Sequence, residues 1–597
     1  MFDEEEISNI TRESFGKTLL EDLKRDLRAN PFSFCVDAST VGGENILAIK
    51  VRYVDDSDPN DSLKNRIFGI KPLEDSSTGE IIFNVLKEKL FTEKAIEDNF
   101  IGIAHDHASS LSSLKKGLVG RLKDLKSNFL DLKDPCHSLN LTLKNSFKIL
   151  PVKIREFITS IHKHFKNSPQ RKSIFKKIQI ERNMSPLLLK QYVKTRWLSL
   201  GESLQRLLLL WDVLKQYMQI YKKDVLIEEE GIEEKEEEDE SDDDDGEDID
   251  VGKTLNCSEL YERLSDKVFR IQIAFLNYIV RKINIYNIRF QDPTLSIADL
   301  KTEIFACYED ISSQIVCPDL MNQSNLDERL KLKWKVYRVK NKWFLKDEDF
   351  IANAFNKLEY FGVLEKLSKQ EKEEFCRCFK DFHANILHYL QYYFPFHDSL
   401  LNSIDFLQLN DGPDFSFIQK VKSFNNYFNL LGENKKEELE NELVKLSQKA
   451  TKYLVMKANS TEPKMTFEDI WRMIEHNDSL KNIAFLARAA RALPISSAPI
   501  EQSFSIVNLI KTDKKCQLSS ESLEALLMVH DHFSKKEIKI TEEMLIQFDL
   551  VKSELNGRKS LKRNYRKLKS VVFRSQDVNG EEEIIEAENN TKEVKLS

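Results

Sequence analysis

The chain has 597 residues, enough for several domain-sized units, and combines 37 Phe with only 17 Gly and 14 Pro. This composition favours a helix-rich protein, and no apolar run approaches the ~18 residues that a membrane-spanning helix needs. The acidic, polar start argues against a secretory signal, and eight scattered Cys indicate reduced thiols rather than a disulfide framework.

The formal net charge of −8 conceals two segments of opposite sign. Residues 228–250 hold 17 Asp or Glu and one Lys, a local charge of −16. Residues 140–200 hold 14 Lys or Arg and two Glu, a local charge of +12. We predict that the acidic run is disordered, because it cannot bury itself. The basic segment is either a phosphate-contacting surface or a set of solvated helix faces.

Residues 32–39, FSFCVDAS, predict the first strand, after a polar and partly helical segment at 1–30. Successive side chains of a strand point to opposite faces, so Phe32 and Val36 face one way and Asp37 faces the other way. The pattern predicts that Asp37 ends this strand. A buried, unpaired carboxylate is costly, so Asp37 either begins an exposed loop or has a partner or a metal ion.

Three further strands and a helix are predicted next. The run ILAIKVRYV predicts a hairpin with the first strand, and RIFGIKPL at 66–73 predicts a third strand. Ser77 and Thr78 are expected to open a helix that continues through Leu90. The apolar run at 99–106 predicts a buried fourth strand beside and parallel to the first, and it ends in Asp106. A meander of three strands, a helix and a parallel fourth strand is the opening of a ribonuclease-H-like fold.

No further strand is predicted after residue 107. Nearly every stretch from about 140 to 540 has helical spacing, including one long amphipathic helix at about 190–222. We therefore predict an α+β, predominantly helical fold. A family resemblance, carried by motifs quoted below, implies that a ribonuclease-H-like sheet is split by a large all-helical insertion. It implies a polar segment at 1–30, the first part of the ribonuclease-H-like domain at 31–150, a helical insertion at 151–480, the second part with the dimerisation region at 481–540, and a charged tail at 541–597.

One set of carboxylates is a candidate metal site. Asp37 and Asp106 follow strands at the edge where α/β sheets place ligands, and Glu501 lies in the first turn of a helix that begins near Pro499. Three such carboxylates can hold two Mg²⁺ or Mn²⁺ ions, which clamp the attacking and leaving oxygens of phosphodiester exchange. Spacing alone is a weak argument, because 98 acidic residues allow many triads.

Two other metal arrangements remain as alternatives. One stretch with helical spacing offers four zinc ligands, namely Cys376, Cys378, His383 and His388. These four side chains do not share one helix face. The apolar stripe between them favours a helix that packs in the core over a zinc site. His105 and His107 flank Asp106 in the sequence. Because successive side chains of a strand point to opposite faces, the two His side chains cannot both lie on the same face as Asp106.

Six pieces of the sequence, in order, resemble the hAT superfamily of transposases. They are FSFCVDAST with ENILAIKVRYVD, NFIGIAHDHASSLSSLKKGL, CHSLNLTL, VKTRWLSLGESLQRLL, the helical stretch to about 480, and LPISSAPIEQSFSIVNLIKTDKKCQLSSESLEALLMV. The resemblance implies that Asp37, Asp106 and Glu501 are the catalytic, metal-binding carboxylates. It also implies DNA contacts by three further residues: His137 near the active site, and the pair Arg196 and Trp197, whose indole can stack on an unpaired base.

The sequence departs from the family pattern at several positions. His107 stands where Gly usually follows the second Asp, and Gln502 stands where Arg commonly follows the Glu. Asp134 occupies the place of the Cys in a Cys-x-x-His pattern. The 36 residues before Asp37 contain no zinc-finger pattern, so a DNA-end-reading finger is not expected in this sequence.

Two functional hypotheses follow. The first is a transposase-derived nuclease that binds DNA and cleaves it with Mg²⁺ or Mn²⁺. The second is a domesticated, catalytically silent nuclear dimer that binds DNA or proteins. Both predict a homodimer or higher oligomer through about 465–535, whose apolar residues exceed what one small sheet can cover. Seven Lys or Arg among residues 558–569 predict a nuclear location. Neither a membrane nor a small-molecule substrate is expected.

Overall fold

The computed structural model describes residues 10–41, 43–55, 63–73, 77–166, 168–190, 198–228, 254–332, 334, 344–355, 367–408, 415–459, 467–475, 477–511, 518–533, 544 and 547. Three predictions fall outside these residues: the disordered acidic run, apart from its first residue; the basic cluster at 558–569; and the pair Arg196 and Trp197. The division into domains at the predicted boundaries also stays a prediction.

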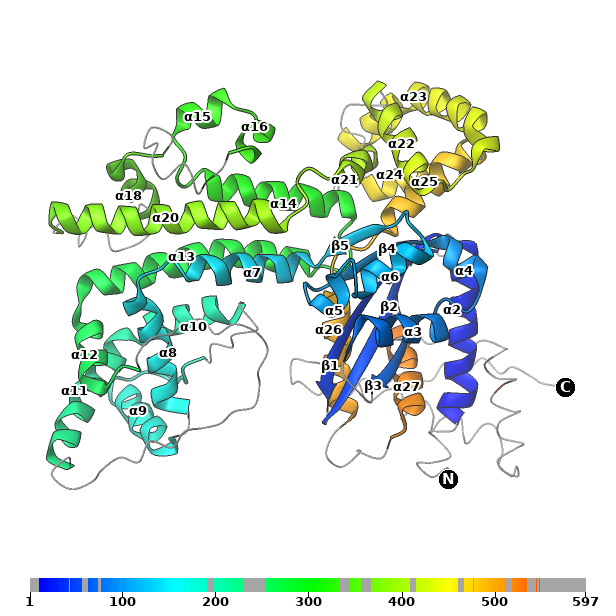
Figure 1. Ribbon diagram of the computed structural model, residues 1–597. Helices are drawn as coiled ribbons and strands as arrows, with labels where there is room; N and C mark the ends of the chain where they lie inside the picture. The colour runs from blue at the N-terminus through cyan, green and yellow to red at the C-terminus, as the bar shows by residue number, and fades with distance from the viewer. Residues whose placement is uncertain are drawn as a thin grey trace.

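The described chain is predominantly helical and contains one five-stranded sheet, which confirms the predicted α+β class. In Figure 1 the sheet forms one lobe at the lower right, and a row of long helices connects it to a second, helical lobe at the lower left. A further group of helices lies above the sheet. Within the described residues, no helix is both long and apolar enough to cross a membrane.

The sheet has the strand order β3-β2-β1-β4-β5. Its strands are β1 (Phe32–Val41), β2 (Glu44–Val54), β3 (Leu63–Leu73), β4 (Phe100–His105) and β5 (Leu130–Lys133). The first three form an antiparallel meander, and β4 and β5 add in parallel beside β1. The meander and the parallel fourth strand are as predicted. The prediction that strands stop after residue 107 is wrong, because the four-residue β5 pairs with β4.

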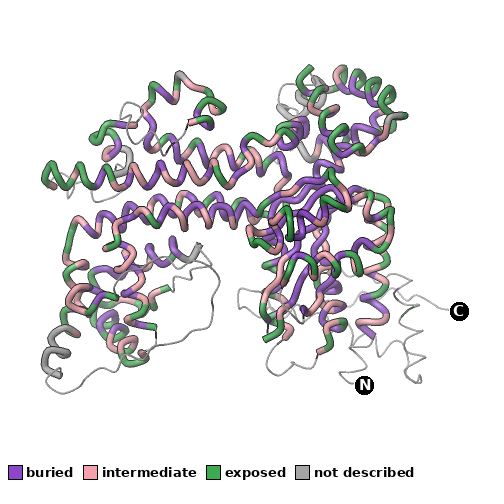
Figure 2. The backbone as a smooth tube through the Cα atoms, viewed as in Figure 1, coloured by how far each residue is buried: buried purple, intermediate pink, exposed green. Residues whose placement is uncertain are grey.

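The two faces of the sheet are covered by different parts of the chain. Phe32, Phe34 and Val36 pack with helices that are close in sequence. These are α2 (Lys17–Ala29), α3 (Gly79–Lys89), α4 (Lys94–Asn99) and α6 (Leu118–Leu125). Cys35 and its neighbours on the opposite face pack with α26 (Ala498–Ile510) and α27 (Ser520–Phe533). The alternation predicted for the first strand is therefore confirmed, and buried residues line the sheet in Figure 2.

Asp37 does not end its strand, and that prediction is wrong. The hairpin continues to the pair Val41 and Glu44, because β2 supplies antiparallel partners along the whole length of β1. The parallel neighbour β4 is shorter, and its last pair with β1 joins Cys35 to Ala104. Asp37 thus lies just past the point where β4 stops pairing, on a strand that continues.

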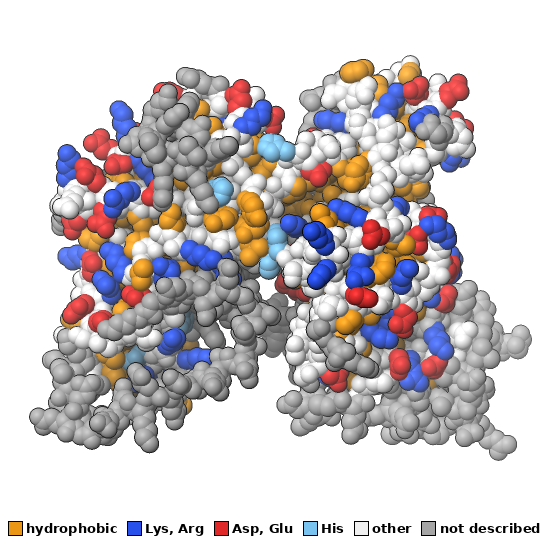
Figure 3. Space-filling model, viewed as in Figure 1, with side chains coloured by type: hydrophobic (Ala, Val, Ile, Leu, Met, Phe, Trp, Pro, Cys, Tyr) orange, Lys and Arg blue, Asp and Glu red, His pale blue; other side chains and the backbone are white. Residues whose placement is uncertain are grey.

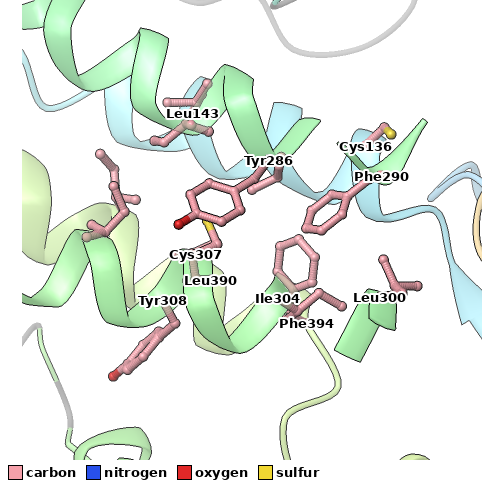
Figure 4. Close-up of a cluster of buried hydrophobic side chains, with 14 of the residues drawn as sticks. Cys136, Leu143, Tyr286, Phe290, Leu300, Ile304, Cys307, Tyr308, Leu390 and Phe394 are labelled. Atoms are coloured by element: carbon pink, nitrogen blue, oxygen red, sulfur yellow. The ribbon is translucent and has the colours of Figure 1, made fainter. Parts of the chain in front are cut away.

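The helical body begins with α7 (Pro135–Phe147), which packs with the long helices α13 (Lys267–Phe290) and α20 (Lys369–Tyr393). Both of these also pack with α14 (Ile297–Ser312). Figure 4 shows their shared core, where Tyr286, Phe290, Cys307 and Phe394 point toward one another. The helical lobe contains α8 (Val152–Lys166), α9 (Pro169–Glu181), α10 (Leu198–Leu209), α11 (Trp211–Glu228) and α12 (Cys257–Ser265). The short helices of this body are α15 (Pro318–Gln323), α16 (Leu326–Leu330) and α18 (Asp347–Phe355). Two other short helices pack with the helices that cover the sheet, namely η1 (Thr11–Gly16) with α27 and α5 (Ser109–Ser112) with α6.

One continuous helix at about 190–222 was expected, and the structure instead has α10 and α11, which meet at Leu210. Residues 191–197 lie outside the described chain. At the break Trp211 is buried, and its indole N–H donates a hydrogen bond to the carbonyl oxygen of Leu264 at 3.0 Å. Helical spacing of apolar residues reports which face is buried and does not report whether the helix is continuous.

The C-terminal segment is part of the core of one chain. The helices above the sheet are α21 (Ser399–Ser403), η3 (Ile404–Gln408), α22 (Phe415–Phe428), η4 (Glu433–Lys435), α23 (Lys436–Ala458), α24 (Phe467–Glu475), η5 (Asp478–Leu480) and α25 (Lys481–Arg491). Ile483, Leu486 and Ala490 of α25 are fully buried, as is Ile500 of α26. The apolar excess that suggested a dimer surface is therefore accounted for within a single chain.

Two leucines of this segment provide a test of that arrangement. Leu486→Ala should lower the free energy of unfolding by about 2–5 kcal/mol, because Leu486 is 0% exposed and its loss leaves a cavity. Leu509→Ala should change it by less than about 0.5 kcal/mol, because Leu509 of α26 is 73% exposed. Urea unfolding followed by circular dichroism measures both. Equal effects of the two variants would contradict the described packing.

Candidate functional site

Asp37 lies on the sheet face that α26 covers. Its β1 neighbours on that face are Ser33, whose hydroxyl donates to Ala492 O at 2.5 Å, and Cys35, which packs against the helix. One carboxylate oxygen of Asp37 accepts a hydrogen bond from the backbone N–H of Ala38 at 2.8 Å. The side chain is therefore oriented by its own strand.

Asp106 follows the last residue of β4 directly. Its Oδ1 accepts a hydrogen bond from the backbone N–H of Ala108 at 2.8 Å, an arrangement that turns the chain away from the sheet. Because β4 runs parallel to β1 and stops short of Asp37, the two aspartates come from the same edge of the parallel pair. This is the edge where the sequence predicted them to meet.

Glu501 is exposed in the first turn of α26, as predicted. The inward face of this helix carries Ile500 and Phe504, which pack on the sheet beside Cys35. The apolar face of α26 thus determines where its acidic first turn lies.

The three predicted carboxylates influence one another electrostatically. The pKa of Asp37 is raised to about 7, first by burial and then by the negative charge of Asp106. The Ala38 N–H opposes this shift, whereas Glu501 and Asp134 add to it. Like charges brought together in a low-dielectric site disfavour ionisation. Asp37, Asp106 and Glu501 are therefore neighbours, although they come from three distant parts of the sequence.

The donor chemistry of this neighbourhood suits a hard divalent cation. Carboxylate oxygens are the ligands that Mg²⁺ and Mn²⁺ prefer, and a cation would relieve the repulsion that raises the pKa of Asp37. Within the described part of the chain, no three His, Cys, Asp or Glu side chains are gathered closely enough to coordinate one ion. Acidic side chains therefore lie near Asp37, but the described residues do not form a complete set of metal ligands.

Asp134 is a residue of this site that sequence reasoning treated only as a departure from a family pattern. It is 2% exposed and caps α7, since its Oδ1 accepts the backbone N–H of His137 at 2.6 Å. Its Oδ2 accepts the backbone N–H and the hydroxyl of Ser497 at 2.6 and 2.8 Å. The Asp-Pro pair before the apolar run of α7 was a readable N-cap signal. Nothing in the local sequence pointed to Ser497.

Histidines line the side of the site next to Asp106. The ring of His107 stacks on His137, with centroids 5.2 Å apart, and meets the edge of Tyr393 at 5.3 Å. Burial lowers the pKa of His107 to about 3, so the ring is neutral. His137, a predicted DNA contact, is the third residue of α7 and lies beside the residue that follows Asp106.

His105 and His107 have separate partners in the structure. His105 is buried, and its Nε2 lies 2.7 Å from the carboxylate of Asp131 on β5. The four zinc candidates of the helical body lie on α20, where Cys376 and His383 are buried and His383 Nδ1 lies 2.8 Å from Phe379 O. The described residues thus offer no zinc cluster there.

The raised pKa of Asp37 predicts how stability depends on pH. From the ordinary value of 3.8 up to about 7, the unfolded chain releases the proton that the folded chain retains, so stability falls as the pH rises. The penalty is absent near pH 4 and complete above pH 7. Without metal ions, Asp37→Asn should be more stable than the wild type at pH 8 by on the order of 3 kcal/mol, and about equal at pH 4.

Urea titrations in the presence of a chelator at both pH values measure this difference. Asp124→Asn, which changes an exposed aspartate of α6, is the matched control and should show no such trend. A constant difference between Asp37→Asn and wild type across the pH range would contradict the proximity of the carboxylates.

The C-terminal part of the chain matches a known family. Residues 448–533 match the family model described as the hAT family C-terminal dimerisation region. The matched residues extend from α23 to the end of α27, so they include Glu501 and the helices that cover the second face of the sheet. No curated protein matches the chain. The C-terminal part of the chain is therefore similar to the dimerisation region of hAT-family transposases.

Proposed function

We propose that this protein is a transposase-derived nuclease with a ribonuclease-H-like catalytic domain that cleaves DNA strands with the help of a divalent cation. The observation that carries the proposal is the placement of Asp37 and Asp106 at the same edge of the parallel pair β1 and β4, on the side of the sheet covered by the helix that carries Glu501. The strand order, an antiparallel meander followed by two parallel strands beside β1, supports the same fold. A chain whose dimerisation region is of the hAT type is a suitable context for this chemistry.

In this proposal Asp37, Asp106 and Glu501 hold Mg²⁺ or Mn²⁺, two ions if the site is fully active. When bound, such ions stabilise the charge on the attacking and leaving oxygens of a phosphodiester. The residues of the chain orient the site. The Ala38 and Ala108 N–H groups fix one oxygen of each aspartate, and the neutral His107 packs behind Asp106 without adding positive charge.

Metal binding is the direct test. Mn²⁺ at millimolar concentration should raise the melting temperature of the wild type, because a ligand of the folded state stabilises that state. Asp37→Asn and Asp106→Asn should abolish the rise. Asp266→Asn, which alters a helix-capping aspartate at the start of α13, should preserve it. A wild-type protein without any metal-dependent rise would refute the nuclease proposal.

DNA binding is proposed for the basic helices of the second lobe. Along α8 and α9 the acidic residues are Glu156 and Glu181, and the basic residues are Lys153, Arg155, Lys163, Lys166, Arg171, Lys172, Lys176 and Lys177. Figure 3 shows Lys and Arg side chains over both lobes and His side chains in the narrow middle between them. Binding through phosphates would be tolerant of sequence and sensitive to salt.

The exposed pair Lys176 and Lys177 tests this surface. Changing both to Glu should weaken binding to a DNA duplex and reduce the slope of log affinity against log salt by about 2, since each phosphate contact contributes roughly 0.9. Lys369→Glu together with Lys372→Glu, on α20, makes the same charge change elsewhere. Fluorescence anisotropy at several salt concentrations measures both, and equal slopes for the two double variants would rule out this surface.

The runner-up is a catalytically silent protein that binds DNA or other proteins. It is favoured by the absence, among the residues described, of any group of three side chains already gathered around a metal position. This alternative predicts the same fold and the same affinity for DNA. It differs in predicting that Mn²⁺ does not bind the protein and does not raise its melting temperature.

Self-association as a homodimer or higher oligomer is proposed on the strength of the dimerisation region at 448–533. The segment first expected, about 465–535, lies almost wholly within that region, although many of its apolar side chains are buried within one chain. Light scattering of the full chain at tens of micromolar tests this, and a species of monomer mass would exclude it. The nuclear location predicted from residues 558–569 is part of the same proposal and can be followed with a fluorescent fusion that lacks them.

A further inference from the structure

We propose that Asp134 is the positioning residue of the site: it fixes the start of α26, and so Glu501, relative to the two strand-borne aspartates. The inference rests on the proposed nuclease function for its purpose. The contacts that carry it are independent of that function.

Asp134 joins three separate parts of the chain. Its backbone N–H donates a hydrogen bond to the carbonyl oxygen of His105 at 2.7 Å. His105 is the last residue before Asp106. Its Oδ1 caps α7 at His137, and its Oδ2 accepts both the N–H and the hydroxyl of Ser497. One residue therefore connects the end of the strand that precedes Asp106 to the start of the helix that carries Glu501.

The first turn of α26 receives no cap from its own N-cap side chain, although Ser496 Oγ accepts the backbone N–H of Ala498 at 3.2 Å. Ser497 is the N-cap residue of α26, yet its side chain makes no capping hydrogen bond to that helix. A Ser at this position ordinarily accepts an N–H from the first turn. Here the hydroxyl donates instead to Asp134, across 363 positions of sequence. The start of α26 is thus held from outside the helix.

The segment that leads into α26 is fixed at both ends. Ser33 of β1 holds Ala492 by the hydrogen bond described above, and Asp134 holds Ser497. Between these two anchors the chain changes direction from α25 to α26. Ser496 and Ser497 are 3% and 6% exposed, so water cannot readily replace the lost acceptor if Asp134 is changed.

Asp134 is a positioning residue and not a further metal ligand. Its two carboxylate oxygens already accept three hydrogen bonds from N–H or O–H donors, which use most of the acceptor capacity of a carboxylate. Asp37 and Asp106, by contrast, each have one oxygen held by a backbone N–H.

The test uses a substitution that separates the two tasks of Asp134. Ser caps a helix about as well as Asp, so Asp134→Ser retains the cap on α7. Its shorter side chain has a single oxygen and cannot also serve Ser497. Asp134→Asn is the second variant, since it matches the size of Asp but has one acceptor oxygen rather than two. Asp266→Ser is the control, because Asp266 caps α13 in the same way at the opposite end of the helical bundle.

Hydrogen exchange of the full chain gives the first readout. In Asp134→Ser, the amides of residues 495–504 should exchange at least about tenfold faster than in wild type, while the β1–β2 hairpin is unchanged. Mn²⁺ binding gives the second readout, and the apparent dissociation constant should rise about tenfold in Asp134→Ser, with a smaller rise in Asp134→Asn. Asp266→Ser should change neither quantity.

The outcomes distinguish this inference from the proposed function. Unchanged exchange at 495–504 in both Asp134 variants, or unchanged Mn²⁺ affinity despite faster exchange, overturns the positioning role. Equal acceleration of exchange in the hairpin also overturns it, because that would indicate general destabilisation. A wild-type protein that fails to bind Mn²⁺ refutes the nuclease function, and the exchange data then decide by themselves whether Asp134 holds the helix that carries Glu501.

Discussion

The structure depends on one hydrophobic requirement, namely that the second face of the sheet needs a cover. The first face is closed by helices within about 100 residues of β1, whereas the second face is closed by α26 and α27. Burial of Ile500 and Phe504 against Cys35 supplies the favourable free energy for this long-range contact. Glu501 comes next to Ile500 in sequence, so the packing that completes the core also completes the acidic neighbourhood.

The acidic neighbourhood has the opposite energetic character. Asp37 loses hydration and meets other carboxylates, and both effects raise its pKa. Two favourable sets of contacts hold this unfavourable arrangement of carboxylates in place. They are the apolar contacts of α26 with the sheet and the hydrogen bonds of Asp134 to Ser497. Local strain of this kind is common where a protein binds a charged ligand, and it persists only because the surroundings fix it.

The sequence predicted local features well and long-range partners poorly. Alternation at 32–36 correctly assigned both faces of β1, and Thr78 correctly marked the start of α3. The strand β5 was missed because four residues hold too little alternation to be recognised. The burial of α25 and α26 within a single chain was not foreseen, because the second face of the sheet, which needs a cover, was not considered. The role of Asp134 could not be read, because Ser497 is 363 positions away.

The long interval between the sheet and its second cover has a consequence during synthesis. At roughly 5–20 residues per second, the ribosome needs about 20–80 seconds to proceed from the end of β4 to the start of α26. Throughout that time the face that carries Cys35, Ile46 and Ala48 lacks the cover that α26 and α27 supply. The nascent protein therefore presents an apolar sheet face that chaperones can bind, and a transcript truncated before residue 498 would yield a product prone to aggregation.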